Sequence, residues 1–105
     1  MPDLKEQPNL KDFQKYVQQL EIERGFDDQT VIEKCLLLGE EIGELFKAVR
    51  KSEKLKIDMN SQFTSVGDEL TDIFIYLCAI ANRFNIDLEE AFRAKEEINK
   101  KRIWQ

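Results

Sequence analysis

Apolar residues recur at helical spacing in four segments of the chain, and polar stretches separate these segments. The first segment covers residues 10–24. Side chains three or four positions apart lie on the same side of an α-helix, so this segment is predicted to be helical. Asn9 is suited to cap the start of the helix, and Gly25 is suited to end it. The predicted inward face consists of Phe13, Val17 and Leu20.

Two longer helices are predicted over residues 29–52 and 61–84. The charged stretch between them, residues 53–60, lacks a clear period and is predicted to be a loop. The apolar stripe of the first of these helices consists of Val31, Cys35, Leu38, Ile42, Leu45 and Val49. The stripe of the second consists of Val66, Leu70, Ile73, Leu77 and Ile80.

A fourth helix is predicted over residues 87–102, where Asp87 and Glu90 form a D-x-x-E start signal. Its predicted inward residues are Leu88, Ala91, Phe92 and Ile98. The four segments predict an all-α fold, a single domain over residues 1–105 that resembles a four-helix bundle. Residues 73–81 are apolar on all sides, which is typical of a helix buried all round. One short chain cannot easily cover such a helix, so we expect homo-oligomerisation to complete the bundle.

Composition narrows the possible partners. The chain has 105 residues and a net charge of −5, from 16 basic and 21 acidic residues. This sign argues against binding of a nucleic acid polymer or a membrane surface. The longest uncharged run, residues 73–82, is too short to span a bilayer, and the N-terminus has no apolar signal segment. We therefore expect a cytoplasmic protein, with Cys35 and Cys78 as reduced, buried thiols.

Four carboxylates occupy unexpected positions beside the apolar stripes. Glu41 and Glu44 form an E-x-x-E pair on the second helix, and Glu69 and Asp72 form an E-x-x-D pair on the third. No lysine or arginine shares the stripe at residues 37, 41, 44 and 48, or the stripe at 65, 69, 72, 76 and 79. Carboxylates three positions apart repel each other, and partial burial increases the cost.

A hard divalent cation would supply the missing positive charge. Oxygen ligands without histidine or cysteine favour Mg²⁺, with Mn²⁺ as a possible substitute. The chain contains no histidine, which also argues against a di-iron bundle with Glu-x-x-His motifs. The plainer alternative is a pair of solvated acidic faces. Gly39 and Gly43 lie four positions apart in the same helix, and they provide either close helix packing or room for a metal-bound phosphate.

The motifs L-G-E-E-I-G-E-L at residues 38–45 and G-D-E-L-T-D at 67–72 resemble the signature of the MazG-like all-α nucleotide pyrophosphohydrolases. These proteins are related to dCTP pyrophosphatases and dimeric dUTPases. The segments A-K-E-E-I-N-K-K-R-I-W at residues 94–104 and E-R-G-F at 23–26 also resemble the family. The resemblance implies Mg²⁺-dependent hydrolysis of a nucleoside triphosphate, (d)NTP, to a monophosphate and pyrophosphate, by a homo-dimer or homo-tetramer.

The resemblance also implies roles for individual residues. It makes Glu41, Glu44, Glu69 and Asp72 the metal ligands. Either Glu41 or Glu44 would take the proton of the attacking water as the catalytic base. Residues expected to contact the substrate are Glu40, Lys95, Asn99, Arg102, Phe26 and Trp104.

Plainer interpretations remain open at several of these positions. The lysines at the end of the chain also suit a solvated helix end, and Phe26 and Trp104 also suit ordinary packing. The sequence does not separate one base or sugar from another. The competing hypothesis for the whole chain is a non-catalytic helical interaction or regulatory module.

Overall fold

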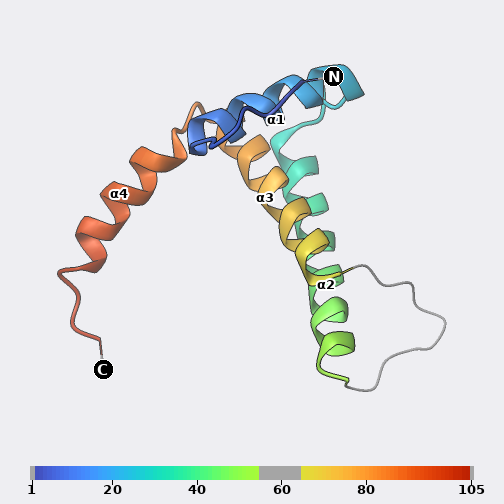
Figure 1. Cartoon of the computed structure of the whole chain (residues 1–105). Coiled ribbons are helices and arrows are strands. Elements are labelled where there is room, and N and C mark those ends of the chain that lie inside the picture. The colour runs from blue at the N-terminus through green and yellow to red at the C-terminus, as the bar shows by residue number, and fades with distance from the viewer. Residues whose placement is uncertain (1, 55–64, 105) are drawn as a thin grey trace.

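The computed structural model describes residues 2–54 and 65–104 and contains four α-helices and no strand within these ranges. The helices are α1 (Leu10–Arg24), α2 (Val31–Ser52), α3 (Val66–Arg83) and α4 (Leu88–Asn99). The predicted all-α class is confirmed. α2 and α3 lie side by side, α1 crosses near one end of this pair, and α4 projects away from it (Figure 1).

Polar caps determine where the helices begin. Asn9 and Asp12 form a reciprocal capping box at the start of α1, and Gly25 ends that helix at a left-handed φ of 74°. Thr30 caps α2, so this helix begins two residues later than predicted. Ser65 caps α3. The predicted start of this helix at residue 61, like most of the predicted loop at residues 53–60, lies outside the described residues.

The hydrophobic core lies between α1 and α3. Val17 and Leu20 from α1 pack against Cys78 and Ala79 from α3, and all four are buried. The rings of Phe13 and Phe74 meet edge to face, with their centroids 5.3 Å apart. The predicted inward face of α1 and the predicted burial of Cys78 are therefore confirmed. Burial raises the pKa of the Cys78 thiol to about 11, which keeps it protonated at neutral pH.

The predicted core stripes of α2 and α3 are wrong in part, because about half of their residues are exposed and the others are only half-buried. Ile42 and Val49 on α2 and Leu70 and Leu77 on α3 are exposed, as is Cys35, which had been predicted to be buried. α2 carries apolar side chains on two sides, and periodicity alone could not decide which side meets α3. The side of α2 that the structure buries carries Lys34, Leu37, Glu41, Glu44 and Ala48.

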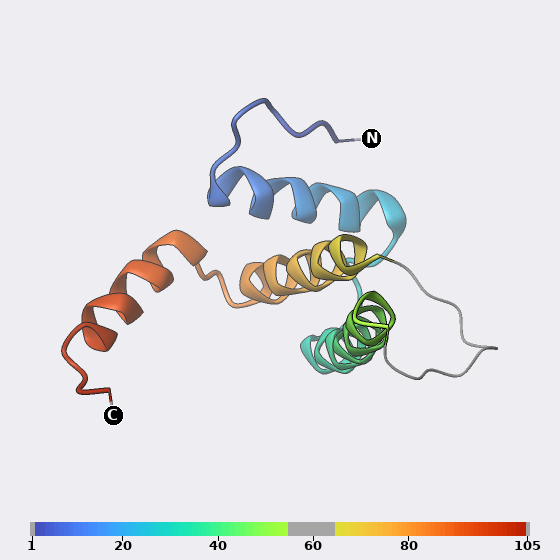
Figure 2. The same ribbon diagram turned by 60° about the horizontal axis from the view of Figure 1, so that its bottom comes forward.

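The fourth helix also differs from its prediction. α4 ends at Asn99 rather than residue 102, and none of its residues is buried. Phe92 and Ile98, which had been predicted to point inward, are 66% and 55% exposed. The reason is visible in Figure 2, where α4 extends away from the α2–α3 pair.

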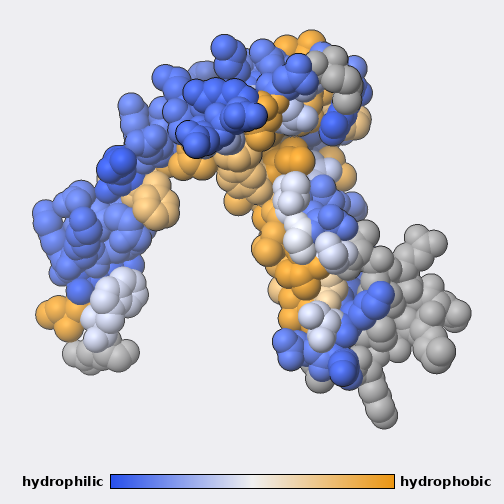
Figure 3. All heavy atoms as spheres, in the orientation of Figure 1, coloured by the Kyte–Doolittle hydropathy of each residue, from blue (hydrophilic) through white to orange (hydrophobic). Residues whose placement is uncertain are grey.

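Residues 73–81, which had been predicted to be buried all round, are also only partly covered. Leu77 lies at the surface, whereas Cys78, Ala79 and Ala81 are buried. Hydrophobic side chains run along the side of the α2–α3 pair that faces α4 (Figure 3). No helix of the described chain is long and apolar enough to cross a membrane.

Candidate functional site

The packing of α2 on α3 brings three carboxylates together. Glu41 comes from α2, and Glu69 and Asp72 come from the first two turns of α3. One oxygen from each carboxylate can be chosen so that all three lie within 4.8 Å of one another. Glu69 is only 3% exposed, Glu41 is half-buried and Asp72 is exposed. We refer to these three residues as the acidic cluster.

The acidic cluster makes ionisation of Glu41 difficult. Partial burial raises the pKa of its carboxyl to about 7, and a hydrogen bond with Glu69 adds to the shift. The negative charges of Asp72, Glu69 and Glu44 also contribute to this value. Burial also raises the pKa of the nearby Tyr76 hydroxyl, and the charges of Glu41 and Asp72 contribute. Burial and the neighbouring negative charges therefore both disfavour ionisation of Glu41.

The donor set of the acidic cluster fits a hard divalent cation. Three carboxylates from two helices offer only oxygen ligands, which Mg²⁺ and Mn²⁺ prefer. A bound cation would also neutralise the repulsion that raises the pKa of Glu41. Glu44, the fourth expected ligand, lies outside the acidic cluster, and its Oε1 is 3.5 Å from Lys47 Nζ. Its charge nevertheless acts on Glu41.

The two glycines of α2 leave space beside the acidic residues. A Cβ added at Gly39 or Gly43 would meet no heavy atom of residues 2–54 or 65–104 within 4 Å. Close packing between helices of the same chain therefore does not explain either glycine. Room for a ligand or for another copy of the chain remains as an explanation.

A pocket of about 380 Å³ adjoins the acidic cluster, and Glu41 and Asp72 form part of its wall. The rest of the wall comes from α1, the α1–α2 connection, α2 and α3. The lining residues are Leu20, Glu21, Arg24, Phe26, Gln29, Lys34, Leu37, Glu41, Asp72, Ile75, Tyr76 and Ala79. Aromatic, aliphatic and charged side chains thus meet in one hollow, which is typical of a small-molecule site.

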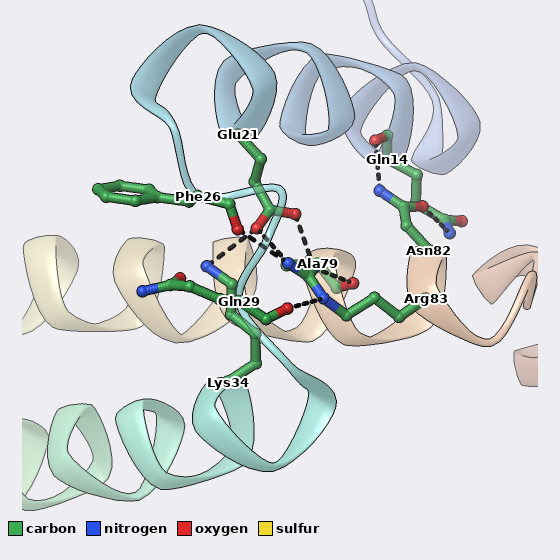
Figure 4. A network of polar contacts seen from close by, with 8 residues as sticks. All are labelled: Gln14, Glu21, Phe26, Gln29, Lys34, Ala79, Asn82 and Arg83. Carbon is green, nitrogen blue, oxygen red and sulfur yellow. Dashed lines mark hydrogen bonds and ion pairs between the residues drawn. The ribbon is translucent and has the colours of Figure 1, made fainter.

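A second charged cluster lies at this pocket, formed by Glu21, Lys34 and Arg83 (Figure 4). The Glu21 carboxylate accepts two hydrogen bonds from the Arg83 guanidinium, at 2.9 and 3.0 Å. Lys34 Nζ lies 2.9 Å from Glu21 Oε2. Burial acts to raise the pKa of Glu21, but the bonds from Arg83 and Lys34 outweigh it and hold this pKa below its usual value. We refer to these three residues as the buried triad.

Arg83 also fixes the connection between α1 and α2. Its guanidinium donates to the backbone carbonyl oxygens of Phe26 and Gln29, each at 3.1 Å. It donates a further bond to the carbonyl of Ala79 on its own helix. The buried triad therefore joins three helices and holds the Phe26 wall of the pocket in place.

The sequence analysis missed the buried triad, although a signal was present. Glu21 follows Val17 by four residues and Arg83 follows Ala79 by four, so each charge extends a buried helical face. Lys34 precedes Glu41 by seven residues and extends the carboxylate stripe by one turn. The predicted carboxylate stripe starts at residue 37 and therefore does not include this lysine.

The residues expected to contact a substrate are divided between two places. Phe26 lines the pocket, with its ring centroid 5.2 Å from Lys34 Nζ. Glu40 is an exposed neighbour of Glu41. The remaining four, on α4 or beyond it, lie away from the acidic cluster (Figure 1). They are Lys95, Asn99, Arg102 and Trp104.

These four residues have surroundings of their own. Lys95 is exposed, and Arg102 lies over the ring of Trp104, 5.9 Å from its centroid. Asn99 Oδ1 is shielded from solvent and has no hydrogen-bond partner within the described residues. Within one chain, the structure therefore does not bring the end of the chain to the carboxylates.

Comparisons with known proteins show which family and which solved structure the chain resembles. The model of the MazG nucleotide pyrophosphohydrolase domain matches residues 29–103, which is more than half of the chain. The chain is also similar to the crystal structure of iMazG from Vibrio DAT 722, with 28% sequence identity and a TM-score of 0.64. This match covers 89% of the present chain and 99% of the other. A comparison with curated proteins finds no match.

Proposed function

Because the chain belongs to the MazG nucleotide pyrophosphohydrolase family, we propose that it hydrolyses nucleoside triphosphates to monophosphates and pyrophosphate in a Mg²⁺-dependent reaction. The observation that carries this proposal is the acidic cluster at the wall of a pocket large enough for a nucleoside. By hydrolysing surplus or unwanted nucleotides, the protein would act as a nucleotide-pool sanitising enzyme.

The cation would be held by Glu41, Glu69 and Asp72. Glu44 would either bind it as a fourth ligand or lie next to it without binding. A bound Mg²⁺ would lower the pKa of a water molecule and offset charge on the phosphate oxygens. Mn²⁺ is the expected substitute, because it accepts the same oxygen ligands. The raised pKa of Glu41 supports this assignment, because burial and the neighbouring carboxylates both disfavour its charged form without a cation.

Two residues are suited to take the proton from the attacking water. Glu44 lies one turn from Glu41 and outside the acidic cluster, so its carboxylate need not be occupied by a cation. Glu41 is the other possible base, because a pKa of about 7 suits proton transfer at neutral pH. In either case the phosphates lie at the acidic cluster and the nucleoside extends into the pocket, toward Phe26 and Tyr76.

We also propose that the active form is a homo-dimer or homo-tetramer. Large apolar side chains on α2 and α3 are exposed, among them Phe46 at 63% and Leu70 at 52%. α4 projects without burying any of its own residues. In such an assembly Lys95, Asn99 and Arg102 of one copy would act on a nucleotide held by the carboxylates of another.

Product analysis tests the proposed reaction. Incubation of each common NTP and dNTP with the protein and Mg²⁺ should yield the monophosphate and pyrophosphate. Glu41→Gln should abolish this yield and remain folded. Release of inorganic phosphate and a diphosphate would contradict the proposal. Absence of any hydrolysis and of any nucleotide-dependent rise in Tm would favour the non-catalytic interaction module.

Mixing of inactive variants tests the shared site. If each site combines residues from two copies, Glu41→Gln and Lys95→Ala subunits should regain part of the activity when they are mixed and allowed to exchange. The recovered activity would come from sites that combine an intact Glu41 from one subunit with an intact Lys95 from the other. If mixed samples stay as inactive as the separate variants despite proven subunit exchange, the shared site is wrong.

A further inference from the structure

Lys34 has a charge that the buried triad does not need. The triad contains one carboxylate and two cations, and Arg83 alone already satisfies Glu21 with two parallel hydrogen bonds. Lys34 is nevertheless only 3% exposed. A buried ammonium is costly unless its N–H donors are satisfied, so a further hydrogen-bond acceptor is expected at this place.

The contacts of Lys34 leave part of its ammonium group available. Within the described residues, its one oxygen partner is Glu21 Oε2, whereas the group carries three N–H donors. Its other neighbours are aromatic, with ring centroids of Phe26 and Tyr76 at 5.2 and 5.3 Å. Lys34, Phe26 and Tyr76 all line the pocket. A ligand in this pocket would therefore meet a poorly hydrated donor between two aromatic walls.

The position of Lys34 along α2 indicates which part of a nucleotide it would meet. It precedes Glu41 by seven residues on the same helical face, which corresponds to about 10 Å along the helix axis. The phosphates lie at the acidic cluster in the proposed function. Lys34 is thus about two turns beyond them, at the end of the pocket where the base would lie.

We propose that Lys34 is a specificity-determining residue that donates a hydrogen bond to a carbonyl oxygen of the nucleobase. This inference rests on the proposed function. Uracil, thymine, cytosine and guanine each carry a ring carbonyl, and adenine carries none. A site built around a hydrogen bond discriminates strongly, because its buried donor stays unsatisfied when the wrong ligand binds. The pocket therefore favours bases with a carbonyl oxygen over adenine.

Binding of non-hydrolysable nucleotides tests this proposal without relying on turnover. The probes are the α,β-methylene analogues of dUTP, dCTP, dGTP and dATP, titrated with Mg²⁺ into wild type and Lys34→Met by calorimetry. Wild type should bind the dATP analogue most weakly. Lys34→Met should lose about ten- to a hundredfold in affinity for the carbonyl-bearing analogues and little for the dATP analogue.

A matched control separates this effect from a general one. Lys11→Met makes the same chemical change at an exposed lysine outside the pocket and should leave all four affinities unchanged. Equal losses for all four analogues in Lys34→Met would overturn the proposal and would indicate a phosphate contact or a structural role. Unchanged affinities would overturn it as well.

Changes to the base keep the test independent of the folding of any variant. The pyrimidinone analogues of dUTP lack either the carbonyl at position 2 or that at position 4. One of these two pyrimidinone analogues should bind to wild type as weakly as the dATP analogue does. If both retain the full affinity of the dUTP analogue, the proposal is overturned. If the analogues bind but no natural nucleotide is hydrolysed, the proposed function fails. The measured affinities still decide the role of Lys34 in that case. If no analogue binds, the proposed function and the proposed role of Lys34 both fail.

Discussion

The acidic cluster and the buried triad border the same pocket, and both use charged side chains from α2 and α3. Their charges are opposite. The acidic cluster combines three carboxylates, whereas the triad surrounds one carboxylate, Glu21, with two cations. The pKa of Glu21 is lowered and the pKa of Glu41 is raised, although Glu21 is the more deeply buried of the two glutamates. The triad thus supports the fold with its own bonds, whereas the acidic cluster is the proposed site of a cation.

Removal of Arg83 should produce the largest change in stability. Arg83→Met deletes both guanidinium bonds to Glu21 and the bonds to Phe26 and Gln29. Glu21 keeps its pair with Lys34, but the loss of four hydrogen bonds from the guanidinium should still cost about 3–5 kcal/mol in the free energy of unfolding. Urea denaturation measures this loss. Arg93→Met is the control, because its pair with Glu89 is exposed and should contribute less than about 1 kcal/mol. Similar losses in both variants would contradict the structural role of the triad.

Neutralisation of the acidic cluster should affect activity and not folding. Glu69→Gln should lower kcat/KM by roughly a hundredfold or more, because it removes a ligand of the proposed cation. Without Mg²⁺ the same variant should be at least as stable as wild type, since one repelling charge is gone. Glu33→Gln, an exposed change in the first turn of α2, should leave the activity nearly intact. A fully active Glu69→Gln protein would show that Glu69 is not a ligand.

The two clusters should also respond to pH in opposite directions. Glu41 has a pKa of about 7 in the folded protein, above its ordinary value of 4.5. Between these two values the unfolded chain releases a proton that the folded chain keeps, so stability without metal should fall as pH rises. The loss should be about 2 kcal/mol after allowance for solvent screening.

Urea unfolding of wild type and Glu41→Gln in metal-free buffer, at about pH 5 and about pH 8, measures this contribution. The difference between the two proteins isolates the titration of Glu41. Glu21 behaves in the opposite way, because its lowered pKa gives stability that is lost only as the solution becomes acidic. If the difference between wild type and Glu41→Gln stayed constant across the window, the repulsion in the acidic cluster would be disproved.

The smallest effect is expected at Lys34. Lys34→Met removes one cation from the triad but leaves Glu21 paired with Arg83 at 2.9 Å. No carboxylate is left unbalanced, so the loss of stability should stay below about 1 kcal/mol. Thermal melting at constant pH measures it. A loss as large as that of Arg83→Met would make Lys34 a structural residue and would weaken its role as a reader of the base.

The success of the sequence analysis differed from helix to helix for physical reasons. α1 has a single apolar face and clear caps, and its bounds and inward residues were predicted correctly. α2 is apolar on two sides, so the choice of its inner face depended on its contact with α3. The exposure of Leu70, Leu77 and Phe92 in one chain was not foreseen, because periodicity shows that a face is apolar and not what covers it.

The site was likewise predicted only in part. Spacing identified Glu41, Glu69 and Asp72, because carboxylates beside an apolar stripe are visible in the sequence itself. It did not identify the buried triad, whose members lie on three helices and far apart along the chain. Nor did it reveal that Lys95 and Asn99 lie away from the acidic cluster, since the direction of α4 is set by the short turn before it.

Titration with Mn²⁺ tests most directly whether the acidic cluster needs a cation. The electron paramagnetic resonance signal of free Mn²⁺ falls when the ion binds to protein. It is measured with wild type, Glu69→Gln and Glu33→Gln, each in the absence of nucleotide. We predict saturable binding to wild type and Glu33→Gln, displacement of Mn²⁺ by Mg²⁺, and loss of this binding in Glu69→Gln. Equal binding to wild type and Glu69→Gln, or no saturable binding to wild type, would contradict this prediction.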